Sequence, residues 1–291
     1  MDRFTSILLA AGLGCFALAF VLSGVYPWLI TDAREPEATI AEVARRVTPE
    51  FKQLKEAYPV AFAAAFPGAD ECLTDKDLAG VPLDDPRRAR SEDAWRAAHT
   101  IALRDGRDAY VAEACWHCHS QYVRPVANEA QRFGRVRSAA DDNNALQRPV
   151  LWGTRRVGPD LTHEGGRRSN DWHVAHLRDP ASTSPGSIMP RYTWYFRDGW
   201  QVWRTIDPEL AEREGLAPTT RYPIPGVYAT EAEARSALER VRAETPENLH
   251  AERDRLEVAP SSGPNETALA LLAYLQWLGT WDASQREGVP Q

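Results

Sequence analysis

The chain has 291 residues, of which 43% are hydrophobic and 26% are charged, and this composition excludes a wholly disordered or collagen-like protein. Its 41 acidic residues outnumber its 34 lysines and arginines, and the net charge of −7 argues against a protein that binds nucleic acid. Four cysteines are too few for a disulfide-dense scaffold in a chain of this length. We therefore expect at least one packed core.

The first predicted element is a membrane anchor within residues 1–34. Residues 7–30 form a run of 24 residues without a charge, and a helix that rises about 1.5 Å per residue then spans a hydrocarbon core of roughly 30 Å. A cleavable signal peptide is the alternative, because Ala17-Leu18-Ala19 resembles a cleavage site. The apolar region of such a peptide is usually only about 7–15 residues long, whereas this run continues past Trp28. We predict one uncleaved transmembrane helix, with the rest of the chain on one side of the membrane.

Residues 35–104 are predicted to form a helical linker or insertion. Helix-forming side chains dominate 38–65, a segment rich in Pro, Gly and Asp follows over 67–86, and a further helix opens near Ser91. Asp105-Gly106 is predicted to end that helix, and residues 107–118 are predicted to form the next one.

The chemistry of the chain is concentrated in Cys115-Trp116-His117-Cys118-His119. This C-x-x-C-H pattern is the attachment signature of c-type haem, in which two thioethers hold the porphyrin and the histidine binds iron. Cysteines three positions apart on a helix face the same side and can meet the two vinyl groups. A zinc ribbon would need a second cysteine pair, and a thioredoxin-like pair is expected in a βαβ context. We therefore predict one covalent haem c per chain.

The other two cysteines are assigned no redox role. Cys15 lies within the predicted membrane helix, where small residues favour helix packing. With Cys115 and Cys118 committed to haem, Cys72 is expected to be a buried or half-buried thiol without a covalent partner.

A second axial ligand is expected from Met189, the only methionine besides the initiator. It precedes Pro190 in a proline-flanked loop suited to holding one soft ligand, and Met/His ligation raises the reduction potential into the range of electron carriers. A bis-histidine haem is the alternative, with His163, His173 or His176 as the second ligand. The remaining histidines, His99, His117 and His250, are expected at the surface.

Further residues are expected around the haem. A carbonyl within 158–161, which includes Pro159, is expected to accept the Nδ1 proton of His119 and fix its ring, although a plain turn is the alternative. Residues 106–200 carry more arginines than acidic residues, which suits the pairing of two haem propionates. The candidates for that pairing are Arg124, Arg155, Arg156 and Arg178.

Residues 201–262 are predicted to form a charged, solvent-exposed excursion. Thr230 and Glu233 form a capping-box pattern for a helix to about residue 244, and Thr245-Pro246 opens another. Asn265 is then expected to cap a helix that stops at Gly279 and is buried on most sides, since Gln276 is its only strongly polar interior residue. Residues 283–291 form a C-terminal tail.

Four stretches together resemble subunit II of the cbb3-type cytochrome c oxidases, the membrane-anchored mono-haem subunit of a bacterial haem-copper oxidase. They are GRDAYVAEACWHCHSQYVRP (106–125), RPVLWGTRRVGPDL (148–161), SNDWHVAHLRDPASTSPGSIMPRYTW (169–194) and AYLQWLGT (273–280). The chain departs from the family pattern in the long segment 50–104 and in the expanded, charged segment 200–262. Neither departure touches an expected ligand.

The resemblance implies Cys115 and Cys118 as attachment sites and His119 and Met189 as axial ligands. It implies an all-α fold, in which the anchor carries a class I cytochrome c domain over 105–282. In that domain the helix at 106–118 crosses the helix at 267–278 near the haem.

The resemblance also implies a function in respiration. A di-haem cytochrome c subunit would pass single electrons through this haem to the catalytic subunit, which reduces oxygen and pumps protons. The chain itself would not react with oxygen, because a six-coordinate iron has no open position. The family implies a haem domain on the periplasmic side of the inner membrane and a calcium ion at the interface with the catalytic subunit. The mono-haem subunit of a nitric oxide reductase, and a haem-based sensor or small peroxidase, are the alternatives.

Overall fold

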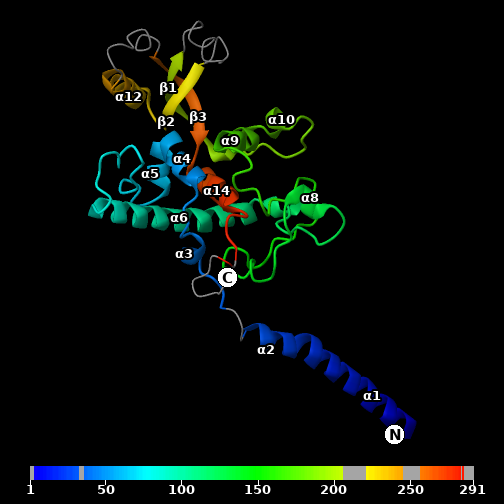
Figure 1. The fold of residues 1–291 in the computed structure, drawn as a ribbon. Coiled ribbons are helices and arrows are strands. Elements are labelled where there is room, and N and C mark those ends of the chain that lie inside the picture. Colours follow the sequence, from blue (N-terminus) through cyan, green and yellow to red (C-terminus); the bar gives the residue numbers. More distant parts are fainter. Residues whose placement is uncertain (1–2, 33–35, 206–220, 245–255, 283, 285–291) are drawn as a thin grey trace.

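A computed structural model of the chain describes residues 3–32, 36–205, 221–244, 256–282 and 284. Its N-terminal helical segment extends away from a body of packed helices and one small sheet (Figure 1). That segment consists of α1 (Arg3–Phe20), the π-helical turn η1 (Val21–Val25) and α2 (Tyr26–Asp32). The 28-residue helix Arg3–Ile30 is long and apolar enough to cross a membrane, and none of its most apolar 18-residue stretch is buried. This segment is therefore a candidate membrane span, as predicted.

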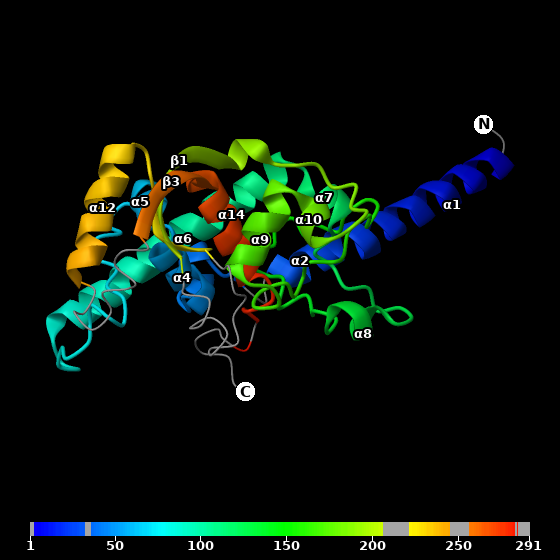
Figure 2. The ribbon, with the colours of Figure 1, turned by 90° about the horizontal axis from the view of Figure 1, so that it is seen from above.

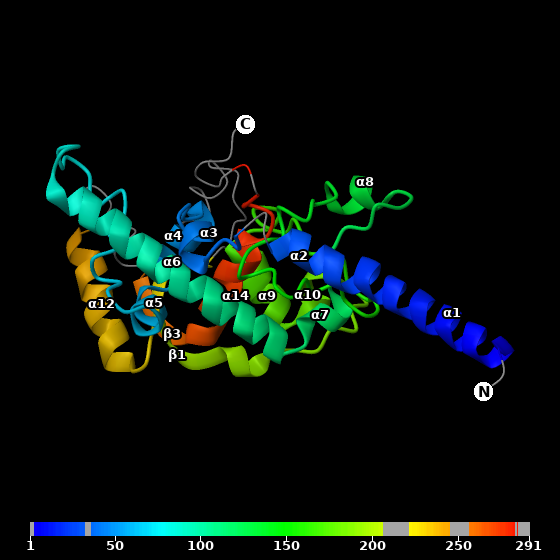
Figure 3. The same cartoon turned by 90° about the horizontal axis from the view of Figure 1, so that it is seen from below.

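The body is mainly helical. Its helices are α3 (Ile40–Val43), α4 (Pro49–Ala57), α5 (Pro59–Ala65), α6 (Pro86–Ala112), α7 (Cys115–Cys118), α8 (Glu129–Phe133), α9 (Asn170–Arg178), α10 (Pro180–Thr183), the 3-10 turn η2 (Thr193–Tyr195), α12 (Glu231–Glu244) and α14 (Glu266–Trp277). Figures 2 and 3 show α12 and the sheet at one end of the body and α7 and α8 toward the other, with α6 running between the two ends.

The predicted helix break at Asp105-Gly106 is wrong, because α6 continues through it to Ala112. A Cβ on Gly106 would lie 2.0 Å from the carbonyl oxygen of Ala270 in α14. Gly106 therefore permits the close crossing of α6 and α14 instead of ending a helix. The cost of a glycine inside a helix, roughly 1 kcal/mol, is offset by this helix contact.

Helix α14 is the centre of the core and confirms the sequence prediction. Asn265 caps it by accepting a hydrogen bond from the Ala268 N–H at 3.0 Å. Every residue from Ala268 to Trp277 is buried. The Gln276 amide is satisfied within the core, because it donates to the Arg168 carbonyl at 2.9 Å and accepts from the Gly166 N–H at 3.0 Å.

The fold is not strictly all-α, which corrects the prediction from sequence. Strands β1 (Phe196–Thr205), β2 (Arg221–Tyr228) and β3 (Leu256–Pro264) form an antiparallel sheet in the order β2-β1-β3. Strand β1 pairs with β3 without interruption, with Val202 opposite Val258.

The segment 201–262 is also more than a solvent-exposed excursion. Helix α12 packs on the sheet around a small core of its own, formed by Val202, Ala237, Leu238 and Leu256. The predicted capping box opens α12, since the Glu233 carboxylate accepts from the Thr230 N–H at 3.1 Å and the Thr230 hydroxyl accepts from the Glu233 N–H at 3.3 Å. The helix expected at Thr245-Pro246 lies outside the described residues.

The segment before the motif packs into the same core as α14. Phe51 of α4 is the centre of an aromatic cluster, with ring centroids 5.2 Å from Phe62, 5.9 Å from Trp95 and 5.0 Å from His99. His99 is fully buried, so its predicted surface position is wrong. Its Nδ1 lies 2.9 Å from the Ala44 carbonyl oxygen, and burial lowers its pKa to about 4.

Candidate haem site

The C-x-x-C-H motif forms a short helical turn directly after α6. Ala114, in the left-handed region at φ 55°, redirects the chain into α7, and His119 follows α7 in an extended conformation. The Tyr110 hydroxyl, at the end of α6, donates a hydrogen bond to the His119 carbonyl at 2.8 Å. The end of the core helix therefore sets the position of the motif.

Two contacts orient the His119 imidazole. Its Nδ1 lies 3.0 Å from the Pro159 carbonyl oxygen, which is the contact predicted for the segment 158–161. Gly158 lies against the ring, because a Cβ there would be 2.2 Å from Cε1 of His119. Burial lowers the pKa of His119, although the Pro159 hydrogen bond opposes this. A neutral imidazole with Nδ1–H bonded to a carbonyl leaves Nε2 free to ligate a metal.

Two adjoining cavities meet at the motif. The Trp172 cavity, of about 500 Å³, reaches Trp172 of α9 and Leu271 and Leu275 of α14. The Ile188 cavity, of about 630 Å³, reaches Cys118, Val157 and Ile188. The two cavities share six of their lining residues: Cys115, His119, Pro159, His176, Ser184 and Met189.

Met189 reaches the cavities from a short loop after α10. The Ser187 N–H donates to the Ser184 carbonyl at 3.0 Å, and the Met189 N–H donates to the Ser187 hydroxyl at 3.2 Å. The loop thus places the thioether of Met189 and the imidazole of His119 on the walls of one space. Two thiols, one neutral imidazole, one thioether and apolar walls are a set of groups that suits haem c.

The three histidines predicted as alternative ligands differ in which cavities they line. His163 lines neither cavity, and its Nε2 lies 2.9 Å from the Arg135 carbonyl oxygen. His173 lines the Trp172 cavity alone. His176 lines both cavities, stacks on Trp172 with a centroid distance of 4.6 Å, and its Nδ1 lies 2.6 Å from the Thr183 hydroxyl. Among these three histidines, His176 is therefore the one that shares both cavities with His119 and Met189.

The four arginines that the sequence suggested for pairing with the haem propionates lie in different places. Arg155 lines the Ile188 cavity and is exposed, whereas Arg124 and Arg156 line neither cavity. The guanidinium of Arg178 stacks 4.6 Å from the Phe196 ring and donates to the Ser262 carbonyl. Sequence reasoning missed the arginines of the Trp172 cavity, which are Arg132, Arg167 and Arg168.

Arg156 and Asp160 form a polar core beneath the site. Arg156 pairs with Glu129 and, at 3.3 Å, with Asp160, whose side chain is fully buried. The Asp160 carboxylate accepts from the Ser120 hydroxyl at 2.5 Å and from the Tyr122 N–H at 2.9 Å. These bonds hold the loop that carries Pro159 against the loop that follows His119.

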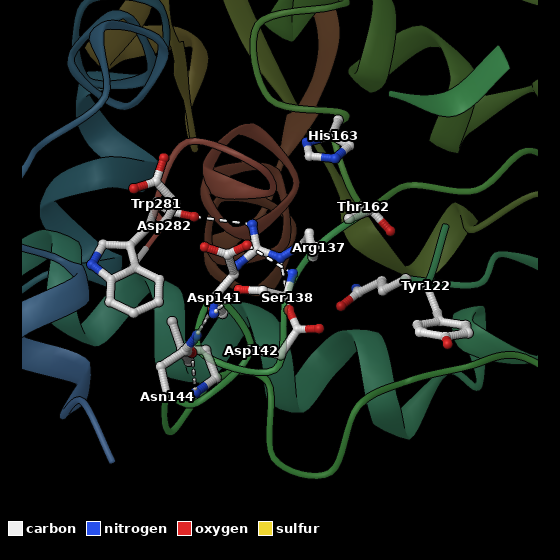
Figure 4. A network of polar contacts seen from close by, with 12 residues as sticks. Tyr122, Arg137, Ser138, Asp141, Asp142, Asn144, Thr162, His163, Trp281 and Asp282 are labelled. Carbon is white, nitrogen blue, oxygen red and sulfur yellow. Dashed lines mark hydrogen bonds and ion pairs between the residues drawn. The ribbon is translucent and has the colours of Figure 1, made fainter. Parts of the chain in front are cut away.

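A second polar network joins the loop before the site to the C-terminal end of the core (Figure 4). The buried guanidinium of Arg137 pairs with Asp142 at 2.7 Å and donates to the carbonyls of Asp141 at 2.6 Å and Trp281 at 3.0 Å. Burial raises the pKa of Asp142, which the Arg137 charge partly opposes. The network thus ties this loop to the end of the core that follows α14.

The described residues contain no group of three or more His, Cys, Asp or Glu side chains arranged to hold a metal ion. No residue in the described ranges is therefore assigned to the calcium ion that the family implies.

The body of the chain is similar to a known protein family. A family model described as "Cytochrome C oxidase, mono-heme subunit/FixO" matches residues 89–281. A comparison with curated proteins found no match. The family match covers more than half of the chain and includes α7, the Met189 loop and α14. The chain therefore belongs to the FixO family of mono-haem cytochrome c oxidase subunits.

Proposed function

We propose that this chain is the electron-transfer subunit of a cbb3-type haem-copper oxidase and relays single electrons through one covalent haem c. The observation that carries the proposal is the meeting of the C-x-x-C-H motif and Met189 on the walls of the two adjoining cavities. The FixO family match supports an oxidase in preference to a nitric oxide reductase.

The residues at the cavities have separate tasks in this proposal. The Cys115 and Cys118 thiols would hold the haem by adding to its two vinyl groups, while Nε2 of His119 and the sulfur of Met189 would bind its iron. Bound haem would supply a one-electron iron couple. Because the chain would supply both iron ligands, oxygen would be reduced only in the catalytic subunit, and this chain itself is proposed to be non-catalytic.

The asymmetry of haem predicts where its propionates lie. The vinyl groups occupy two adjacent pyrroles and the propionates occupy the other two, so propionates point away from the thioether edge. Cys118 lines the Ile188 cavity alone. Cys115 lines both cavities, but three arginines line the Trp172 cavity, so Arg132, Arg167 and Arg168 would hold the propionates there. No propionate contact is assigned to Arg124, Arg155 or Arg156.

The proposed partners are the catalytic haem-copper subunit and a di-haem cytochrome c subunit, with a calcium ion at the catalytic interface. The proposed location is the bacterial inner membrane, with the haem domain on the periplasmic side. The candidate span Arg3–Ile30 would hold the chain beside its acceptor, where tethering raises effective concentration.

Purification of the full-length chain from native membranes in mild detergent tests this proposal. We expect it to co-purify in constant ratio with a haem-b-containing oxidase subunit and a di-haem cytochrome c. Elution of the chain alone, or with a nitric oxide reductase subunit, would contradict the proposed function.

A further inference from the structure

His173 of α9 carries a buried polar atom that the packing leaves unused. Its side chain is 6% exposed, and Nε2 has no hydrogen-bond partner among the described residues. The nearest carboxylate oxygen, Oε1 of Glu164, lies 3.8 Å away, beyond hydrogen-bonding distance. A buried polar group of this kind is costly unless a ligand or water satisfies it.

The surroundings of His173 favour an anionic ligand. His173 and Glu164 line the Trp172 cavity together with Arg132, Arg167 and Arg168. The guanidinium of Arg168 lies over the Trp172 ring at 4.9 Å, and the Trp172 ring meets the His173 ring edge-on at 5.3 Å. Donors therefore outnumber acceptors on this wall, and a carboxylate is the group that would satisfy them.

His173 is poorly suited to an ion pair with Glu164. Burial, with smaller contributions from the nearby His176 and Arg168, lowers the pKa of His173 to about 4. Burial raises the pKa of Glu164. Both shifts favour neutral forms, and a neutral imidazole in its Nε2–H form is a hydrogen-bond donor without a charge.

We propose that Nε2–H of His173 donates a hydrogen bond to a haem propionate in the Trp172 cavity and thereby raises the midpoint potential of the haem. This inference rests on the proposed haem function. A donor to the propionate withdraws negative charge that would otherwise stabilise ferric iron. The competing interpretation is that His173 only packs beside Glu164 and has no contact with haem.

Three variants of the haem-loaded full chain separate these interpretations by their midpoint potentials in equilibrium redox titration. His173→Phe keeps a ring of similar size but lacks the donor, so we expect a lower potential. His173→Gln keeps a donor of comparable reach and should restore the potential toward that of the wild type. His173→Asn, whose amide is one methylene shorter, should behave like the Phe variant and replaces it if that variant does not fold.

The same comparison in a Glu164→Gln background tests the competing interpretation. We expect the His173→Phe or His173→Asn shift to persist there, because the propionate remains. A shift that disappears in that background, or variants with the wild-type potential, would overturn the inference. The absorption spectrum of the wild type keeps the two proposals distinct: missing haem contradicts the proposed function, whereas bound haem with unchanged potentials contradicts only the role of His173.

Discussion

At the scale of single residues, the groups of the site come together in two ways: local spacing sets the motif, and long-range packing sets the arginines. The spacing of Cys115, Cys118 and His119 is local and is the same in the sequence and in the fold. Which arginine faces the cavity depends on how distant loops pack, and Arg156 is directed to Glu129 and Asp160 instead. Burial of His99 was missed for the same reason, since Phe51 reaches it from another helix.

Replacing Met189 tests the second axial ligand. We expect Met189→Ala to lose the weak sulfur-to-iron charge-transfer band and to lower the midpoint potential, because a thioether favours ferrous iron. Arg191→Ala is the matched control, since Arg191 is exposed, lies two positions further along the chain and lines neither cavity. An unchanged spectrum and potential in Met189→Ala would assign the position to another residue, with His176 as the first candidate.

Replacing Arg156 tests the polar core beneath the site. Its side chain is 10% exposed and Asp160 is fully buried, so Arg156→Met leaves a buried carboxylate without its charge partner. We expect a loss of about 3–5 kcal/mol in the free energy of unfolding, measured by denaturant titration. Arg155→Met, at an exposed neighbour, should change stability by less than about 0.5 kcal/mol. Equal effects of the two variants would show that the pairing is not structural.

At the scale of elements, strong local signals predicted helices well and the sheet was missed. Asn265 and the apolar run after it define α14, and the Thr230 capping box defines α12. The strands lie in a charged segment that includes prolines, and pairing of β1 with β3 joins residues about 60 positions apart. Strand pairing over that separation leaves no local pattern in the sequence. Gly106 was misread for a similar reason, because a glycine indicates a helix end unless its contact across the core is known.

The crossing of α6 and α14 gives a prediction at this scale. Gly106→Val places a branched side chain where even a Cβ would lie 2.0 Å from the Ala270 carbonyl. We expect a loss of at least about 1–3 kcal/mol in stability from overpacking, visible as a lower thermal midpoint and weaker haem retention. Arg104→Ala, at an exposed position of the same helix, should leave both nearly unchanged. A Gly106→Val protein of wild-type stability would show that the two helices cross less closely than described.

At the scale of the whole molecule, the body begins almost immediately after the candidate span. The Asn143 side-chain amide donates to the Pro36 carbonyl at 3.3 Å, and Ala38 forms a β-bridge with Asn144. The chain therefore already contacts the body at Pro36, only four residues after α2 ends at Asp32. Under the proposed function, a haem domain attached this closely would suit one fixed acceptor at the membrane better than an acceptor at a distance.

Removing the anchor separates haem binding from function in the complex. A chain that lacks residues 1–31 should keep the spectrum of the full-length protein, because the site is built from residues of the body. The same chain should fail to support oxygen consumption by the oxidase, since it no longer stays beside its acceptor. Full restoration of oxygen consumption by the truncated chain would contradict the role of a fixed subunit.

The pyridine haemochrome assay on the full-length protein, followed by extraction into acidic acetone and mass spectrometry of its peptides, shows directly whether this chain carries covalent haem c. We predict one haem c per chain, which resists extraction and remains on the peptide that contains Cys115 and Cys118. The absence of haem, or haem that extracts freely and leaves both thiols unmodified, would show that this chain is not a haem c protein.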